Sequence, residues 1–258
     1  MSVQTLKGKV ALVTGGGTGL GLGGAKCLAE EGAFVYIVGR RQSVLDEAIR
    51  QIGPNARAIV ADVSRKEEMV NVASIIQQEK SQLDIIFSNA GYCIGKKLEE
   101  VSEDFFDDML NVNLKGQLFT VQAMLPIMNA GGSIILTSSM TAFIGLPEYT
   151  TYAASKAAVI GMARVWTTEL KSRNIRVNVI SPGAIPTEGY ETVQGMTPEQ
   201  IEDFAAKCAA EIPVGRVGRA NEIGDGVVFL ASDASSFING INLTIDGGQT
   251  QVYAGNLS

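Results

Sequence analysis

The chain has 258 residues, of which 46% are hydrophobic and 19% are charged, and its net charge is −6. The length suffices for one large α/β domain over residues 1–258, and the acidic balance argues against a general nucleic-acid-binding surface. The sequence contains no histidine, which excludes Ser-His-Asp and Cys-His catalysis and imidazole ligation of a metal.

The cysteines and the hydropathy pattern indicate where the protein works. Cys27, Cys93 and Cys208 lie far apart, with no Cys-x-x-Cys pair, so they predict a reducing compartment and neither a disulfide framework nor a metal site. Cys93 is interpreted as a buried or semi-buried neutral thiol rather than a reactive one near the site. Residues 1–9 lack the pattern of a signal peptide, and the longest strand-like apolar run, residues 33–38, is too short to cross a bilayer. We therefore expect a soluble, cytoplasmic protein that does not bind membranes.

Strand-like and helix-like stretches alternate along the whole chain. Apolar strands that alternate with helical patterns predict a parallel sheet covered by helices on both faces. Helical patterns include residues 20–31, 103–129 and 151–173. Strands are expected at residues 10–13, 34–38, 58–60, 83–87, 133–136, 175–180 and 241–245. No internal repeat or linker interrupts this pattern, which favours a single domain.

A glycine-rich turn, residues 14–21, follows the first expected strand and opens the first expected helix. Its Gly-x-x-x-Gly-x-Gly spacing lets the backbone approach a pyrophosphate, and the amino end of the helix presents N–H groups to it. We interpret the turn as the phosphate site of a dinucleotide. Its expected binding residues are Gly15, Thr18, Gly19, Leu20 and Gly21.

The end of the second expected strand bears on which dinucleotide is bound. An acidic residue about 20 residues beyond the glycine turn would bind the adenine ribose hydroxyls of NAD. Gly39 stands there instead, followed by Arg40 and Arg41. Two guanidinium groups suit the 2′-phosphate of NADP, although either arginine could be a solvated surface charge. We therefore expect NADP(H) as the cofactor.

Tyr152 and Lys156 are four residues apart in an expected helix, which places them on one face, one turn apart. A phenol has a pKa of about 10 and exchanges protons poorly at neutral pH. A nearby ammonium favours the phenolate and would lower that pKa toward the working range. The pair is therefore a candidate proton donor and acceptor.

These motifs resemble those of the short-chain dehydrogenase/reductase superfamily. The glycine turn and Tyr152-x-x-x-Lys156 carry the resemblance, which covers nearly the whole chain. Further matches follow in the order of that family: Asp62-Val63, Asn89-Ala90-Gly91, Asn113, Ser139, Pro182-Gly183, Thr187 and Asp246-Gly247-Gly248. The resemblance implies a single-domain Rossmann-type fold, in which a doubly wound sheet of seven parallel strands carries helices on both faces.

The resemblance also implies which residues contact the cofactor. Asp62 and Val63 would lie against the adenine, and Asn89 would lie beside the cofactor unless it only caps its own loop. The other implied contacts are Ala90, Gly91, Tyr152, Lys156, Pro182, Gly183, Ile185 and Thr187.

The catalytic residues that the resemblance implies are Asn113, Ser139, Tyr152 and Lys156. Tyr152 would give a proton to the developing alkoxide, and Ser139 would orient the same oxygen. Lys156 would lower the pKa of the tyrosine and bind the nicotinamide ribose, and the backbone of Asn113 would hold a water that links the lysine to solvent. The neighbouring Asn111 and Ser138 fit the pattern of the family less well, and Ser138 is interpreted as structural.

Residues 184–213 contain prolines and glycines that loosen the pattern, and the resemblance implies a mobile flap over the substrate there. Nearby apolar side chains favour a hydrophobic ketone over a charged acid. They are Met140, Phe143, Ile144, Leu146, Ile185, Tyr190 and Met196. The expected activity is that of an NADPH-dependent carbonyl reductase, or of an alcohol dehydrogenase in the reverse direction.

Two other functions stay open. One is reduction of 3-oxoacyl groups on an acyl carrier protein, for which residues 128–132 lack the expected basic cluster although Arg173 is present. The other is a non-catalytic NADP-binding regulator, against which the complete catalytic set argues.

The helix expected over residues 151–173 has almost no polar face, and a helix that is apolar on most sides is buried on most sides. The sheet would cover one side, and a partner subunit would cover the other. Because the resemblance implies dimers or tetramers built through this helix and the preceding one, we expect a homotetramer.

Replacement of Tyr152 by Phe tests the proposed proton donor. The substitution removes the hydroxyl and little else, so turnover should collapse while cofactor affinity stays largely intact. Steady-state kinetics and a dinucleotide-binding titration measure the two quantities. Retained turnover in this variant would refute the assignment.

Overall fold

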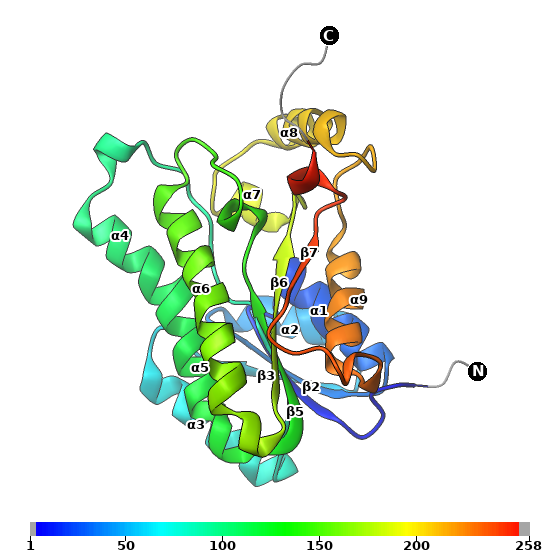
Figure 1. Cartoon of the computed structure of the whole chain (residues 1–258). Coiled ribbons are helices and arrows are strands. Elements are labelled where there is room, and N and C mark those ends of the chain that lie inside the picture. Colours follow the sequence, from blue (N-terminus) through cyan, green and yellow to red (C-terminus); the bar gives the residue numbers. More distant parts are fainter. Residues whose placement is uncertain (1–3, 253–258) are drawn as a thin grey trace.

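Seven parallel strands form one sheet in the order β3-β2-β1-β4-β5-β6-β7 (Figure 1). The computed structural model describes residues 4–252. The strands are β1 Val10–Thr14, β2 Phe34–Gly39, β3 Ala56–Val60, β4 Leu83–Ser88, β5 Met128–Thr137, β6 Arg176–Pro182 and β7 Asn242–Ile245. The doubly wound parallel sheet that the sequence predicts is confirmed.

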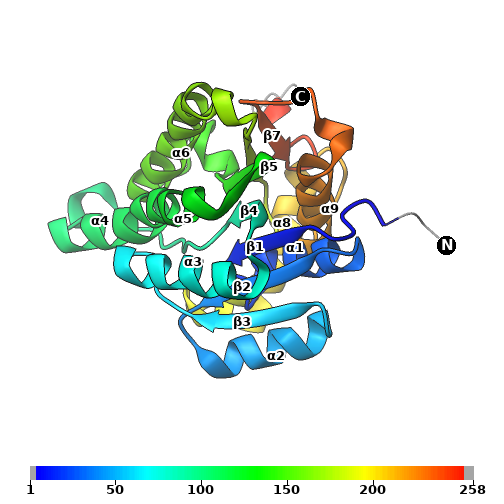
Figure 2. The same cartoon turned by 90° about the horizontal axis from the view of Figure 1, so that it is seen from below.

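Helices cover both faces of the sheet (Figure 2). One face carries α1 (Gly19–Glu30), α2 (Gln42–Ile52) and α9 (Ala220–Ala231), and the other carries α3 (Lys66–Lys80), α5 (Gly116–Met124) and α6 (Thr150–Glu169). Successive strand residues supply the two cores in turn, because side chains alternate across a strand. Leu12 packs into the core beneath α3, α5 and α6, and Val13 packs into the core beneath α1, α2 and α9.

The strand order reverses between β1 and β4, which pair with Thr14 opposite Ser88. From β1 the chain winds toward β3, and from β4 it winds toward β7. The loops that leave these two strands therefore diverge and open a crevice at the carboxyl ends, where parallel α/β sheets bind ligands. The Thr14 hydroxyl holds the two loops together by accepting hydrogen bonds from the N–H groups of Asn89 (3.0 Å) and Ala90 (3.1 Å).

The long helix predicted over residues 103–129 is wrong as a single element. It divides into α4 (Glu103–Leu110), a π-helical segment (Asn111–Lys115), α5 and a 3₁₀ turn (Leu125–Ile127), after which β5 begins at Met128. Proline in that turn cannot continue the α-helical bonding. With the helical bonding interrupted, the carbonyl oxygens of Leu125 and Met128 accept hydrogen bonds from the Arg173 guanidinium.

The segment predicted to be loose, residues 184–213, contains more regular structure than expected. It forms the short helix α7 (Glu188–Thr192) and the longer helix α8 (Pro198–Glu211), which lie above the sheet (Figure 1). A capping box between Thr197 and Gln200 starts α8, because these side chains satisfy N–H groups that the first turn leaves unpaired. Within residues 4–252, no helix has the length and apolar character needed to cross a bilayer.

Candidate active site

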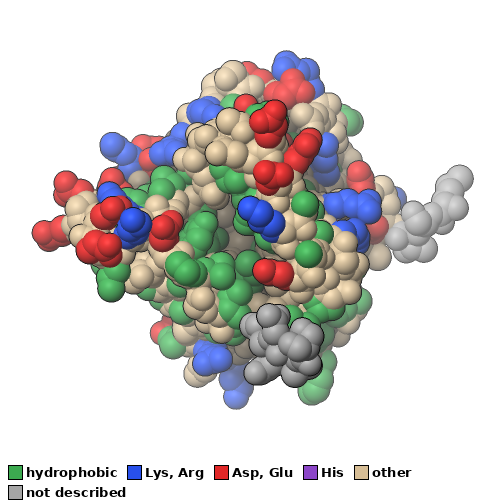
Figure 3. Space-filling model, turned by 90° about the horizontal axis from the view of Figure 1, so that it is seen from above, with side chains coloured by type: hydrophobic (Ala, Val, Ile, Leu, Met, Phe, Trp, Pro, Cys, Tyr) green, Lys and Arg blue, Asp and Glu red, His purple; other side chains and the backbone are tan. Residues whose placement is uncertain are grey.

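A cleft of about 680 Å³ opens at the carboxyl ends of the strands. Seen from above, the molecule is hollowed there and hydrophobic side chains gather around the mouth (Figure 3). The walls come from the glycine turn after β1, the loops after β2 to β6, the start of α6, and the helices α7 and α8. The cleft therefore joins the crevice between β1 and β4 to a pocket beneath α7 and α8.

The backbone of the glycine turn shows why its glycines are needed. Gly15 and Gly19 have φ angles of +66° and +53°, a region that side chains disfavour. A Cβ atom at Gly21 would lie 2.1 Å from the carbonyl oxygen of Gly15. The glycines thus place no side chain over the backbone at the amino end of α1, and this arrangement fits the phosphates of a dinucleotide.

Charged residues lie at the far edge of this crevice. Arg40 and Arg41 are exposed there. The Asp62 carboxylate accepts hydrogen bonds from the Ser64 N–H (2.9 Å) and hydroxyl (2.7 Å). Burial raises the pKa of Asp62, but these two bonds outweigh it, and the charges of Arg40 and Arg65 lower the pKa further. Asp62 therefore stays ionised beside one of the arginines that could meet a 2′-phosphate.

Lys156 is almost fully buried, with 3% of its surface exposed. Its Nζ donates to the Thr137 carbonyl oxygen at 3.1 Å and lies 5.5 Å from the centre of the Tyr152 ring. The Ser138 hydroxyl donates to the Lys156 carbonyl at 2.8 Å, so it fastens α6 to the end of β5. Burial lowers the pKa of Lys156 to about 8, which lets the ammonium titrate just above neutral pH.

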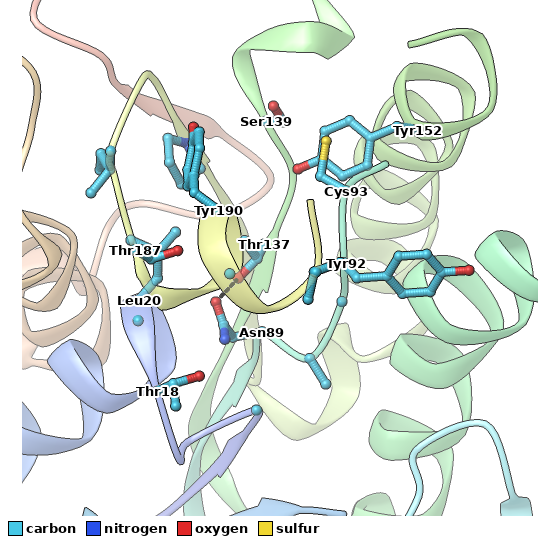
Figure 4. Close-up of a pocket in the computed structure, with 18 of the residues that line it drawn as sticks. Thr18, Leu20, Asn89, Tyr92, Cys93, Thr137, Ser139, Tyr152, Thr187 and Tyr190 are labelled. Atoms are coloured by element: carbon cyan, nitrogen blue, oxygen red, sulfur yellow. Dashed lines mark hydrogen bonds between the residues drawn. The ribbon is translucent and has the colours of Figure 1, made fainter. Parts of the chain in front are cut away.

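The expectation that the pKa of Tyr152 is lowered is wrong for this structure. Burial raises its pKa above the ordinary value, the nearby Cys93 raises it further, and hydrogen bonding to Ser139 opposes the rise only in part. The Tyr152 hydroxyl points toward Ser139, and the Cys93 sulfur lies beside its ring (Figure 4). Tyr152 therefore keeps its proton at neutral pH, which is the form that donates. Burial also raises the pKa of Cys93 to about 12.

Asn113 lies behind the cleft, in the π-helical segment, and is fully buried. Its side chain clamps the backbone of Tyr92: Oδ1 accepts from the Tyr92 N–H at 2.9 Å, and Nδ2 donates to the Tyr92 carbonyl at 2.8 Å. A Cβ at Gly91 would lie 3.0 Å from Asn113 Oδ1 and 3.5 Å from Lys156 Nζ. The loop after β4 thus lies directly against the lysine.

Most residues that the sequence and the resemblance single out do line this cleft. They are Gly15, Thr18, Gly19, Leu20, Arg40, Arg41, Asp62, Val63, Asn89, Ala90, Gly91, Ser139, Tyr152, Lys156, Pro182, Gly183, Ile185 and Thr187. Gly21 and Asn113 do not line it and act from behind its wall. Of the apolar candidates, Met140, Leu146, Ile185 and Tyr190 line the cleft, whereas Phe143, Ile144 and Met196 do not.

Aromatic residues that the sequence reading missed complete the pocket beyond Tyr152. Tyr149 meets Tyr152 edge to face, with ring centres 6.3 Å apart, and Phe204 of α8 packs on Tyr190 with ring centres 5.2 Å apart. Tyr190 and Tyr152 stand on opposite sides of the cavity (Figure 4). Tyr149 lies three residues before Tyr152, so helical spacing could have identified it. Phe204 is remote in sequence and carried no such signal.

A second tyrosine in the sequence also has a lysine four residues later, and the structure separates the two pairs. Tyr92 and Lys96 lie in a loop rather than in a helix. The Tyr92 side chain points away from Tyr152 (Figure 4), and the Lys96 ammonium lies over the ring of Phe105. Spacing alone therefore does not identify the active pair.

A carboxylate occupies the amino end of α1. Glu188 of α7 accepts a hydrogen bond from the Gly19 N–H at 3.0 Å. The positive end of the helix dipole favours a negative charge at this place. Because the glycine turn also fits a pyrophosphate, Glu188 would compete with the phosphates of a bound dinucleotide for the Gly19 N–H.

Comparison with known proteins relates the whole chain to oxidoreductases. A family model described as Enoyl-(Acyl carrier protein) reductase matches residues 15–250. Oxidoreductase asL5 of Sarocladium schorii is 40% identical over 253 residues, which cover 97% of this chain and 99% of that protein. Hydroxynaphthalene reductase-like protein Arp2 of Metarhizium majus is 37% identical over 257 residues, covering 95% and 96%. The crystal structure of a putative short-chain alcohol dehydrogenase from Sinorhizobium meliloti superposes with a TM-score of 0.88 at 34% identity, covering 98% of this chain and 100% of that one.

Replacement of Glu188 by Gln tests the competition at the glycine turn. Removing the negative charge should tighten NADPH binding about two- to tenfold, because the helix end then meets the phosphates without a rival anion. Isothermal titration calorimetry at low and high salt measures the change, which should shrink as salt screens the charge. Glu191→Gln, on the same short helix, is the matched control. Equal affinities for Glu188→Gln and the unaltered protein would contradict the competition.

Proposed function

The chain belongs to the short-chain dehydrogenase/reductase superfamily, and from this we propose that it is an NADPH-dependent carbonyl reductase for a hydrophobic ketone. In the reverse direction it would oxidise the corresponding secondary alcohol. The observation that carries the proposal is the buried Lys156, 5.5 Å from the centre of the Tyr152 ring, placed where the crevice at the glycine turn meets an apolar pocket.

The residues of this chain supply the acid chemistry of the reaction. NADPH, when bound in the crevice, would supply the hydride for a carbonyl carbon. Ser139 stands beside the Tyr152 hydroxyl, so both can hydrogen-bond one carbonyl oxygen and stabilise the charge that develops there. Tyr152 gives that oxygen its proton. Lys156, an ammonium at neutral pH because its pKa is lowered only to about 8, stabilises the phenolate that remains.

The arginines at the edge of the crevice support NADP over NAD. Gly39 provides no carboxylate to bind the ribose hydroxyls, and Arg40 and Arg41 are exposed to meet a phosphate. An arginine can grip a phosphate through several donors. The charge of Arg40 lowers the pKa of Asp62, so Asp62 offsets part of the positive charge of Arg40. Arg41 is therefore the better candidate to bind the phosphate.

The lining of the pocket supports an aromatic ketone as the substrate. Tyr149, Tyr190 and Phe204 present ring surfaces on more than one side, and aromatic rings stack favourably on such surfaces. Arp2, whose name refers to a hydroxynaphthalene, is similar over nearly its whole length.

An acyl carrier protein substrate has less support, although the description of the matching family model names that carrier. Carrier proteins need basic residues beside the site. The Arg173 guanidinium is already bonded to the Leu125 and Met128 carbonyl oxygens, so it is not available to an acidic partner. A purely regulatory role has no use for a buried lysine beside a tyrosine and a serine.

The proposal of a homotetramer has support on the outer face of α6. Ala154, Ala157, Gly161 and Val165 form an exposed stripe of small and apolar residues along this helix. Small residues at such spacing allow two helices to approach closely.

A ketone panel assayed with NADPH and with NADH tests the activity. Aromatic ketones should be reduced faster than aliphatic or charged ones, and NADPH should be preferred. Binding of NADPH without reduction of any ketone would favour the regulator.

Replacement of Arg41 by Ala tests the cofactor preference. It should lower kcat/KM for NADPH by about 10- to 100-fold, the value of a bond to a charged group, and should leave kcat/KM for NADH unaffected. An equal loss for both cofactors would refute the role of Arg41.

Gly161→Arg tests the assembly. Apart from the backbone of its own helix and its two chain neighbours, no atom of residues 4–252 lies within 4 Å of the place where a Cβ on Gly161 would stand, so the protomer should accept the new side chain. A facing helix would not, and the mass from light scattering should fall to that of a dimer or a monomer. Gln78→Arg, at an exposed site on α3, is the control. An unaltered protein that is already monomeric would contradict the tetramer.

A further inference from the structure

Gln117 is a buried glutamine in α5 that joins two backbone carbonyl groups. Only 1% of its surface is exposed. Its Nε2 donates to the carbonyl oxygen of Asn113 at 3.1 Å and to that of Thr137 at 3.0 Å. The first acceptor belongs to the π-helical segment and the second to the last residue of β5. One side chain therefore links two elements that both border the active site.

The Thr137 carbonyl is also the acceptor of Lys156, whose Nζ donates to it at 3.1 Å. A carbonyl oxygen has two lone pairs and can accept both bonds. Gln117 and Lys156 thus share one oxygen, and any movement of that oxygen moves the anchor of the ammonium. The second bond of Gln117 ties the same oxygen to the segment that carries Asn113.

The geometry fixes how the Gln117 amide is turned. Rotating it by half a turn would bring Oε1 against two carbonyl oxygens, which cannot donate. In the observed orientation Oε1 is buried, and within residues 4–252 no donor reaches it. A buried acceptor without a donor is unfavourable, and the two bonds that Nε2 donates offset that cost. What the glutamine provides at this site is therefore the link between the two carbonyl oxygens.

We propose that Gln117 is a positioning residue of the reductase: it holds the Thr137 carbonyl in place, and through that carbonyl it holds the ammonium of Lys156 beside Tyr152. The role rests on the proposed function, because it acts on the lysine of that site. Gln117 touches neither the cleft nor any reacting atom, since it does not line the pocket. It acts through the backbone of β5.

Replacement of Gln117 by Met tests the role, because Met keeps the volume and removes both donors. The lysine should then be the sole partner of the Thr137 oxygen, and its ammonium form should be favoured. The titration midpoint of Lys156, followed by ¹³C NMR of its Cε and assigned by the signal lost in Lys156→Met, should rise by about 0.5 unit or more. The alkaline limb of the pH profile of kcat should move in the same direction, and kcat should fall about tenfold as the anchor loosens. The dissociation constant of NADPH, from cofactor fluorescence, should stay within about twofold.

Thr120→Val provides a matched control on the same helix. The buried Thr120 hydroxyl donates to the Gly116 carbonyl at 2.8 Å, so this variant loses a bond of the same kind without touching Thr137. It should lower the melting temperature and leave the Lys156 midpoint unchanged. If Gln117→Met does not fold, Gln117→Asn replaces it, because that amide is one methylene too short to reach both carbonyl oxygens.

The outcomes separate the inference from the proposed function. An unchanged Lys156 midpoint in the Gln117 variant, with or without lower stability, overturns the positioning role. A shifted midpoint in a protein that reduces no ketone supports the coupling of Gln117 to Lys156 and refutes the proposed reductase. A shifted midpoint together with a shifted kcat profile supports both.

Discussion

The site depends on one hydrogen bond, from the Lys156 ammonium to the carbonyl oxygen of Thr137. Burying a cation is unfavourable unless it is hydrogen-bonded, and the backbone at the end of β5 supplies the acceptor. The Ser138 hydroxyl bonds the backbone of the same lysine. Two consecutive residues of one strand thus fix both the charged end and the main chain of Lys156. Burial of the Lys156 side chain lowers its pKa to about 8.

The topology of the sheet places this lysine beside the nucleotide crevice. Because β1 and β4 are neighbours and their connections diverge, the glycine turn and the loop of residues 89–91 meet at one edge. That loop also lies against Lys156 and Asn113. The glycine turn and Tyr152 therefore lie along one continuous wall of the cleft, joined by the loop of residues 89–91.

Local sequence patterns predicted the fold and most of the residues that line the cleft. Burial and contacts between residues far apart in the sequence could not be predicted from such patterns. The alternation of apolar strands with helices indicated the parallel sheet, and the glycine turn indicated the crevice. Burial reversed the expected direction of the Tyr152 pKa, since no window of sequence reveals how deeply a side chain lies. The contact between Gly19 and Glu188 joins residues 169 positions apart. The spacing shared by Tyr92 and Lys96 shows how a motif can recur where the backbone is not helical.

The bonds of the Arg173 guanidinium have a consequence for local unfolding of the protein. It reaches from the turn after α6 to the Leu125 carbonyl, in the 3₁₀ turn after α5, and to the Met128 carbonyl at the start of β5. The Arg173 bonds form only when the turn after α6 and the turn between α5 and β5 are both folded. The two turns should therefore unfold and refold as one cooperative unit. Amide protons near residues 125–128 and 170–174 would then exchange with solvent at a common rate, although more than 40 positions of chain, by the order of the sequence, lie between them.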